Sequence, residues 1–204
     1  MEKSSSRPAG RPPKMVAPRE TILEQAAHLF SQAGYEATSL QEVAAAVGIT
    51  KAAIYHYFPT KQVLYETIIM DLLSRLEIYV SQESANETTG PARLMAIMRA
   101  HARFFEANYA AFVTLLHGVS GLSRQVSEQE RVVRDRYEAM LRSALREAHN
   151  KGELQVVDVP ATAIAVLSMM NWMSRWYKPG GSRRAEDFAT EFFILIHDGL
   201  RPRQ

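Results

Sequence analysis

Apolar residues recur at intervals of three and four along most of the chain, which is the spacing of one buried face of an α-helix. We find no alternating apolar and polar run of useful length, so the pattern does not predict strands. The first helix is expected between Pro18, which suits a helix start, and Gly34, which suits a helix end. Its apolar positions are Ile22, Ala26, Leu29, Phe30 and Ala33. The pattern predicts an all-α protein.

About nine helices are expected from the periodic segments and from the Pro, Gly and polar residues that separate them. Two short helices lie within residues 38–61, and the later ones are expected over residues 61–84, 91–106, 109–117, 128–151, 160–177 and 184–199. The 204 residues are enough for a small domain and a larger one. We expect a basic flexible arm over residues 1–17, a three-helix unit over 18–64 and a larger helical domain over 65–204.

Residues 38–61, TSLQEVAAAVGITKAAIYHYFPTK, predict two short helices joined by a tight turn. Gly48 stands where the chain must turn sharply, because glycine enters positive φ without steric cost. Thr50 is a suitable cap for the second helix, residues 51–57. The first helix has one apolar face at helical spacing, formed by Leu40, Val43, Ala44 and Val47.

The second short helix has an exposed face suited to DNA. Projected at about 100° per residue, Lys51, Ala52 and Tyr55 share this face, with His56 at its edge. Ile54 lies on another side and is expected to face the core. Small side chains, a lysine and an aromatic hydroxyl on a short helix suit the major groove, which admits one helix. The alternative is an ordinary helical hairpin without a role in DNA binding.

Four sequence runs, GYEATS at 34–39, VA at 43–44, VGI at 47–49 and IYHYFPTK at 54–61, resemble the DNA-binding region of the TetR/AcrR family of transcriptional repressors. The resemblance implies an N-terminal helix-turn-helix domain and a C-terminal helical domain that binds a ligand and dimerises. It also implies a homodimer that binds palindromic double-stranded operator DNA and is released by a small hydrophobic inducer. One departure is Tyr57, where the family often has histidine.

The helical projection and the resemblance together assign DNA contacts to individual residues. Lys51 and Ala52 are expected to face base edges, with Gln41 and Thr50 as secondary candidates. The remaining candidates, mostly hydroxyl or ammonium side chains that can hold phosphates, are Thr38, Ser39, Tyr55, His56, Tyr57 and Lys61. In a second interpretation, Tyr57 packs against Phe58 instead.

Positive charge is concentrated at the N-terminus, although the net charge of the chain is only +2. Residues 1–19 contain five of the 24 basic residues and one of the 22 acidic ones, which leaves 19 basic and 21 acidic residues in the remainder. The Ser-, Pro- and Gly-rich composition of this arm does not favour a packed core. Arg11, within Gly-Arg-Pro, is a candidate for the minor groove of DNA. The alternative is a solvated leader without a DNA contact.

Several chemistries are not supported by the sequence. Cysteine is absent, and the motifs of nucleotide-binding loops, serine hydrolases and zinc proteases are not found. The six histidines never stand three or four residues apart, which argues against helical metal ligation. We therefore expect no enzyme, no cofactor and no metal site. With no apolar run of about 18 residues and no secretory signal, a cytoplasmic protein without a membrane partner is expected.

A cluster of Met, Trp and polar residues over 169–177 is the main candidate for ligand binding. Asn171 and Arg175 are four residues apart on an otherwise apolar predicted helix, and Trp172 and Trp176 could flank an apolar ligand. Phe105 and His117 are further candidates. The segment RWYKPGG at 175–181 resembles that of family members that sense acyl-CoA thioesters, which implies an acyl-CoA inducer. The alternative is that the Met and Trp residues build a dimer core.

The last two predicted helices, 160–177 and 184–199, are apolar on more than one face. Such helices need partners on both sides, and the family resemblance implies that they form a four-helix homodimer interface. A ligand-dependent activator or a corepressor-type regulator of the same fold is the closest alternative function. An architectural DNA binder is disfavoured by the mixed charge of the body, and a protein without a DNA role is disfavoured by residues 38–61.

Overall fold

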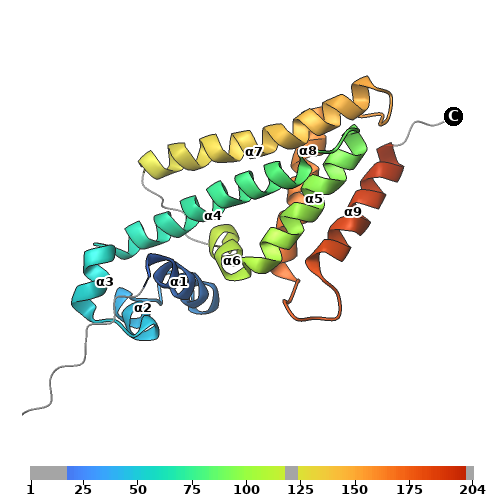
Figure 1. The fold of residues 1–204 in the computed structure, drawn as a ribbon. Helices are drawn as coiled ribbons and strands as arrows, with labels where there is room; N and C mark the ends of the chain where they lie inside the picture. The colour runs from blue at the N-terminus through green and yellow to red at the C-terminus, as the bar shows by residue number, and fades with distance from the viewer. Residues whose placement is uncertain (1–17, 118–123, 201–204) are drawn as a thin grey trace, which may run out of the picture.

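The computed structural model describes residues 18–117 and 124–200, and within them it contains nine α-helices, one short 3₁₀ helix and no strand. Figure 1 shows α1–α3 at one end of the molecule and α5, α8 and α9 at the other, with α4 running between them. The bounds are α1 Arg19–Ala33, α2 Leu40–Val47, α3 Lys51–Tyr57, α4 Lys61–Ser84, α5 Gly90–Ala107, α6 Tyr109–His117, α7 Arg124–Asn150, α8 Val159–Trp172, η1 Met173–Arg175 and α9 Ala185–Leu200. The prediction of an all-α fold is confirmed.

The first three helices are fixed by local capping chemistry. Ser39 and Glu42 form a reciprocal capping box at the start of α2, which satisfies backbone N–H groups at the helix start. Gly48 ends α2 in the left-handed conformation with φ of 77°. The Thr50 hydroxyl accepts a hydrogen bond from Ala53 N at 3.2 Å and caps α3. These signals set the two helices of the motif at their predicted positions.

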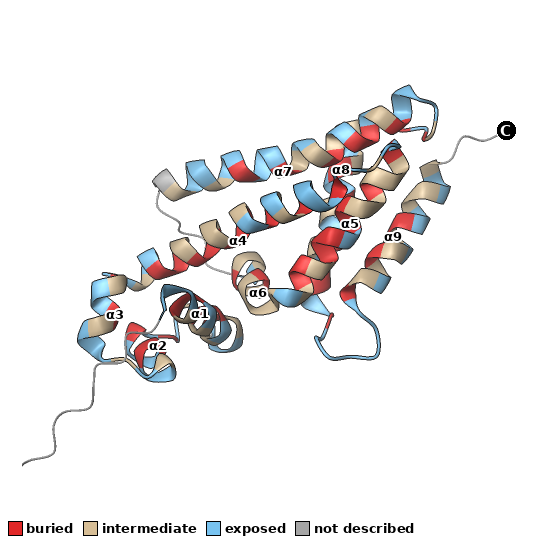
Figure 2. Cartoon of the chain, viewed as in Figure 1, coloured by how far each residue is buried: buried red, intermediate tan, exposed pale blue. Residues whose placement is uncertain are grey.

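Helix α4 belongs to both hydrophobic cores of the molecule. Leu64 and Ile68, in its first turns, pack with buried residues of α1–α3. Leu76 and Val80, further along, pack in the larger core formed with α5, α7, α8 and α9. Figure 2 shows buried residues along most of its length. A shift of α4 relative to the larger core would therefore carry α1–α3 with it.

Helices α5 and α7 approach each other closely at Gly90. A Cβ atom added at Gly90 would lie 2.5 Å from the Cβ of Ala148 and 2.5 Å from its backbone nitrogen. The backbone N–H of Gly90 also donates a hydrogen bond to Glu153 at 3.0 Å. The absence of a side chain at Gly90 is therefore what allows the start of α5 to pack against α7.

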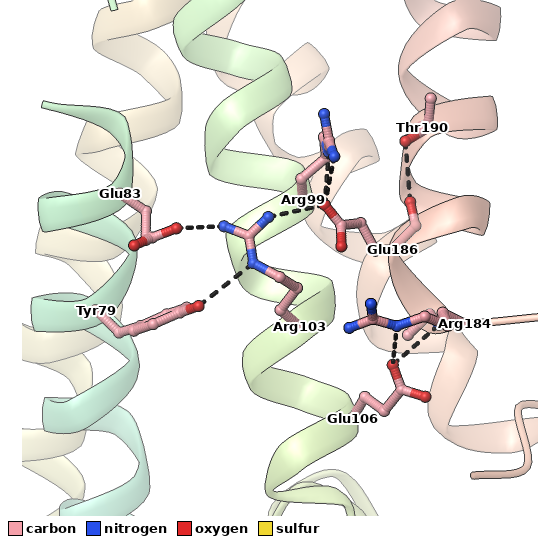
Figure 3. A network of polar contacts seen from close by, with 9 residues as sticks. Tyr79, Glu83, Arg99, Arg103, Glu106, Arg184, Glu186 and Thr190 are labelled. Atoms are coloured by element: carbon pink, nitrogen blue, oxygen red, sulfur yellow. Dashed lines mark hydrogen bonds and ion pairs between the residues drawn. The ribbon is translucent and has the colours of Figure 1, made fainter. Parts of the chain in front are cut away.

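A network of charged side chains joins α4, α5 and α9 (Figure 3). Arg103 of α5 forms an ion pair with Glu83 of α4, and its guanidinium lies 2.8 Å from Glu186 of α9. Tyr79 of α4 accepts a further hydrogen bond from Arg103 at 3.3 Å. Arg99 contacts the same Glu186 oxygen at 2.6 Å. Burial is the largest single influence on Glu186 and by itself would raise the pKa. The hydrogen bonds and charges of Arg99 and Arg103 together outweigh burial and lower the pKa, so this carboxylate stays ionised.

The predicted helix over residues 160–177 is wrong at its C-terminal end. Helix α8 stops at Trp172, and Met173–Arg175 form the 3₁₀ helix η1. The change is linked to Tyr177, whose backbone N–H bonds to Met173 O at 2.8 Å and whose side chain is buried. The Tyr177 hydroxyl donates a hydrogen bond to Glu106 of α5. The chain thus leaves the path of α8 just before the residue that it buries against α5. The predicted start of α7 at residue 128 is also late, because α7 begins at Arg124.

Candidate DNA-binding surface and ligand cavity

Helix α3 presents the predicted reading face to solvent. Lys51, Ala52, Tyr55 and His56 are all exposed, whereas Ile54 is completely buried in the core of α1–α3. Gln41, which lies on the preceding helix α2, is also exposed. The exposed groups therefore include one cation, two aromatic polar side chains and a small alanine that lets a partner approach the backbone.

The predicted phosphate-binding residues differ in their exposure to solvent. Ser39 is exposed, and its hydroxyl accepts a hydrogen bond from Glu42 N at the start of α2. Thr38 is buried, and its hydroxyl donates to Gly34 O at 2.9 Å. Tyr57 is half-buried with its ring centroid 6.5 Å from that of Phe58. Arg11 lies outside the described residues.

Lys61 has intramolecular partners that sequence reasoning missed. Its ammonium donates to Tyr35 O at 2.7 Å and to Glu36 O at 3.2 Å. The same nitrogen lies 4.3 Å from the centroid of the Tyr35 ring, within the range of a cation–π interaction. Lys61 therefore ties the start of α4 to the turn between α1 and α2. A contact between Lys61 and phosphate remains a prediction.

A cavity of about 150 Å³ lies in the larger domain between α4, α5, α6, α7 and α8. Two polar residues on its wall, His101 of α5 and Tyr137 of α7, are buried, and His101 Nδ1 lies 2.7 Å from the Tyr137 hydroxyl. Asn171 of α8 also lines the cavity. Most of the wall is apolar and comes from several helices: Leu73, Leu76, Phe112, Leu115, Leu116 and Leu167. An apolar cavity with a few polar groups is typical of a small-molecule site.

Both groups of the buried pair are neutral near pH 7. Burial lowers the pKa of His101 to about 4, because the charged imidazolium would lose its hydration. Burial also raises the pKa of Tyr137. Sequence reasoning missed both residues, although His101 stands four residues after Ile97 and four before Phe105 on the buried face of α5. The sequence did contain a signal for His101, because a histidine at a position of the apolar face of a helix is expected to be buried.

Of the six predicted ligand residues, only Asn171 lines this cavity. Trp172 is 63% exposed, and the guanidinium of Arg175 lies 5.9 Å from its ring. The ring of Trp176 packs against that of Phe188, with the centroids 4.9 Å apart. Because α8 ends at Trp172, Arg175 does not share a helical face with Asn171 as predicted.

The other two predicted ligand residues also lie away from the cavity wall. Phe105 is fully buried and packs edge-on against Phe112, with the ring centroids 5.4 Å apart. His117 is exposed, and its Nε2 lies 3.1 Å from the Ser174 hydroxyl. The loss of part of its hydration, followed by the charge of Arg175, lowers the pKa of His117. The ends of α6 and η1 therefore meet at a site where the charge of Arg175 acts on His117.

A larger, open cleft of about 410 Å³ lies between α1, α4 and α6. Its wall includes Asp71, Arg75 and Asn108. Arg75 contacts Asp71 at 3.1 Å and also donates to Asn108 at 3.1 Å, so its charge is already matched. The smaller cavity, whose buried His101 has a nitrogen without a hydrogen-bond partner among the described residues, is the better candidate for ligand binding.

Helix α6 connects the cavity with the DNA-binding end. One side of it contributes Phe112, Leu115 and Leu116 to the cavity wall. On another side the Thr114 hydroxyl donates to Ala27 O of α1 at 3.1 Å. A molecule that displaces α6 from inside the cavity would therefore act on α1 directly.

Helices α8 and α9 expose large apolar side chains. Ile164 and Trp172 of α8 are exposed, as are Ile194 and Leu195 of α9, with Leu195 67% exposed. Isolated exposed apolar residues are common, but several on two consecutive helices of the chain make these helices candidates for an interaction surface.

Two family models match the chain. One, described as bacterial regulatory proteins of the tetR family, matches residues 22–68. The other, described as the tetracyclin repressor-like C-terminal domain, matches residues 87–200, more than half of the chain. The chain belongs to the TetR family. It is a DNA-binding transcriptional regulator with a ligand-responsive C-terminal domain, as predicted.

Individual TetR-family proteins are similar over nearly the whole length. The crystal structure of PfmR from Thermus thermophilus is 42% identical, covers 89% of this chain and 99% of its own, and superposes with a TM-score of 0.83. AibR in complex with isovaleryl coenzyme A and operator DNA is 28% identical over 87% of this chain and 97% of its own, with a TM-score of 0.79. The transcriptional repressor KstR2 of Rhodococcus jostii (strain RHA1) is 25% identical over 188 residues, 89% of this chain and 90% of its own.

Within residues 18–117 and 124–200, no three His, Cys, Asp or Glu side chains are grouped so that they could hold a metal ion. None of the helices in the described ranges is both long and apolar enough to cross a membrane.

Proposed function

We propose that this TetR-family protein is a homodimeric repressor that leaves its operator when a small hydrophobic molecule enters the cavity between α4 and α8. The observation that carries the proposal is α6, which supplies both cavity wall and the Thr114 contact to α1. A ligand shifts the protein only if it binds one dimer shape better than the other. In the released shape, the two α3 helices of the dimer would no longer match the spacing between the two halves of the operator.

The DNA side of the proposal assigns residues 18–64 to the DNA-binding domain and 65–204 to the regulatory domain. Lys51 and Ala52 read base edges, supported by their exposure on α3. Gln41 and Thr50 assist them, and phosphate contacts come from Ser39, Tyr55, His56, Tyr57 and Lys61. The buried Thr38 instead supports the turn before α2, because its hydroxyl already donates to Gly34 O. The basic arm over residues 1–17, including Arg11, adds a minor-groove contact. KstR2 is a repressor by name, which favours repression over the activator alternative.

The homodimer forms through α8 and α9 in this proposal. The exposed apolar side chains Ile164, Trp172, Ile194 and Leu195 support it, because burying them would stabilise the association. A two-fold dimer also matches a palindromic operator. Since its target is operator DNA in a bacterial cell, the protein would act in the cytoplasm, as a regulator and not as an enzyme.

The proposed inducer is an acyl-CoA thioester or a related apolar metabolite. Support comes from the apolar cavity wall and from AibR, whose structure contains isovaleryl coenzyme A. Asn171 would contact the part of the ligand inside the cavity. Arg175, His117, Trp172 and Trp176 are candidates for its head group, and Phe105 supports the cavity through Phe112.

The test begins with selection from a random duplex DNA library by the purified protein. We expect a two-fold symmetric consensus, and Lys51→Ala should relax the base preference at one position of each half-site. Lys178→Ala, which removes an exposed lysine far from α3, is the matched control and should leave the consensus unchanged. Isovaleryl-CoA is then titrated into the complex, with release followed by fluorescence anisotropy. An asymmetric consensus, or equal effects of both lysine variants, would contradict the DNA-binding assignment.

A further inference from the structure

The polar pair on the cavity wall has one unmatched group. His101 Nδ1 and the Tyr137 hydroxyl are 2.7 Å apart, whereas His101 Nε2 is buried and has no hydrogen-bond partner among the described residues. A buried nitrogen without a partner destabilises the fold, and native proteins contain few of them. Because His101 also lines the cavity, a molecule inside the cavity is the natural partner for this nitrogen.

The direction of the hydrogen bond between the two side chains decides what that partner must be. Both groups are neutral at pH 7, since burial lowers the pKa of His101 to about 4 and raises that of Tyr137. If His101 Nδ1 donated to Tyr137, both the tyrosine proton and Nε2 would lack partners within the described part of the chain. If Tyr137 donates, the imidazole proton sits on Nε2 and only that N–H is unmatched. The second arrangement leaves fewer unsatisfied groups, so Nε2 is a donor.

The remaining wall limits the size and charge of the partner. The cavity of about 150 Å³ is of the order of an engineered apolar cavity that holds benzene. Two charged residues reach its wall, and each has an opposite charge beside it: Arg134 lies 2.6 Å from Glu130, and Glu138 lies 2.5 Å from Arg142. Glu138 Oε1 has this charge contact but no hydrogen bond among the described residues. A ligand with its own charge would enter a low-dielectric space without an unpaired counter-ion.

We propose that the inducer presents a neutral, hydrogen-bond-accepting oxygen to His101 Nε2, on an apolar body about the size of one six-membered ring. Tyr137 acts as a positioning residue that holds the imidazole in the donating tautomer. This inference rests on the proposed function of the cavity as the inducer site. A thioester or ketone carbonyl satisfies it, whereas a free carboxylate inside the cavity does not.

The test uses two ring compounds of nearly the same shape, cyclohexanone and methylenecyclohexane, which differ in C=O against C=CH₂. Binding to the full-length protein is measured by NMR of labelled methyl groups, and the ring nitrogens of labelled histidine are followed in parallel. One neutral hydrogen bond should make cyclohexanone bind about 3- to 10-fold more tightly. It should also shift the Nε2 resonance of His101, which methylenecyclohexane should not do. Cyclohexanecarboxylate should bind more weakly than cyclohexanone.

Variants separate ligand recognition from a purely structural link between α5 and α7. His101→Phe should abolish the preference for cyclohexanone, and Tyr137→Phe should reduce it by releasing the tautomer. Tyr109→Phe makes the same chemical change outside the cavity, where the hydroxyl bonds to Tyr177 O, and should leave the preference unchanged. If a variant does not fold, the wild-type Nε2 shift and the ratio of the two affinities still decide the question.

Three results would overturn the inference: equal affinities of the wild type for the two rings, an unchanged Nε2 resonance, or no binding of either ring at millimolar concentration. A preference that survives in His101→Phe would likewise remove His101 from the site. Failure of the proposed function looks different. In that case the carbonyl preference is present in the isolated protein, but occupancy of the cavity leaves the affinity for selected operator DNA unchanged.

Discussion

Acidification should destabilise this protein through one residue, His101, well before most carboxylates titrate. The side chain is 2% exposed, and burial lowers its pKa to about 4 in the folded state. In the unfolded chain the pKa returns to about 6.5. Because the folded pKa is the lower one, the unfolded state binds the proton first as the pH falls. Stability is therefore unaffected by this group above about pH 7 and decreases as the pH falls from about 6.5 towards 4.

The size of the effect follows from the two pKa values. A difference between about 6.5 and about 4 corresponds to a loss of about 3 kcal/mol once both states are protonated. At pH 5 the unfolded state is almost fully protonated and the folded state is not, so the loss is already about 2 kcal/mol. Domains of this kind are stable by about 5–15 kcal/mol, which makes the loss easy to measure.

The assay compares urea unfolding of the wild type and of His101→Gln at pH 7 and pH 5, at one protein concentration because a dimer would be concentration-dependent. Glutamine is neutral throughout, so the variant should lose about 2 kcal/mol less than the wild type over this interval. His56→Gln, which removes an exposed histidine from α3, is the control and should follow the wild type. Equal pH dependence of the wild type and His101→Gln would refute the assignment of a buried, neutral His101.

Three further predictions test separate features. Gly90→Ala should destabilise the fold by about 1–3 kcal/mol in thermal unfolding, because the new Cβ would lie 2.5 Å from Ala148 atoms. Gly199→Ala is the control, since a Cβ at Gly199 would have no atom within 4 Å. Lys61→Ala should destabilise the first three helices by roughly 1.5–3 kcal/mol through loss of its bonds to two carbonyls. It should also lower the salt slope of DNA binding by about 1 through loss of the proposed phosphate contact. Unchanged stability would contradict the first role, and an unchanged salt slope the second. Deleting residues 1–17 should lower both DNA affinity and its salt dependence without changing stability, and unchanged affinity would make the arm a solvated leader.

The features that sequence predicted well are those set by neighbouring residues. Gly48 adopts the left-handed conformation, and Thr50 caps the helix that follows it, because each acts on backbone groups within four residues. Helical periodicity likewise predicted Ile54 as buried, and it is. These local signals were enough to locate the helix-turn-helix motif and its exposed face.

The features that sequence did not predict depend on residues far apart in the chain. His101 and Tyr137 are 36 positions apart, and Lys61 meets Tyr35 O across 26 positions. The end of α8 is linked to the burial of Tyr177 against α5, which no local pattern around residue 172 reveals. The prediction placed Asn171 and Arg175 on one face of a helix that in fact ends at Trp172. It also missed the His101–Tyr137 pair of the cavity.

The ion network around Arg103 has a mechanical consequence for α4. It fastens the last turns of this helix, at Tyr79 and Glu83, to α5 and α9, while the first turns carry the DNA-binding end. Helix α4 is thus a rod held at one end, and its 24 residues give it a length of about 36 Å. A tilt of only about 5° around the held end moves the other end by about 3 Å, close to the rise of one base pair. In the proposed mechanism, a small displacement beside the cavity would become a change in register on DNA through this leverage.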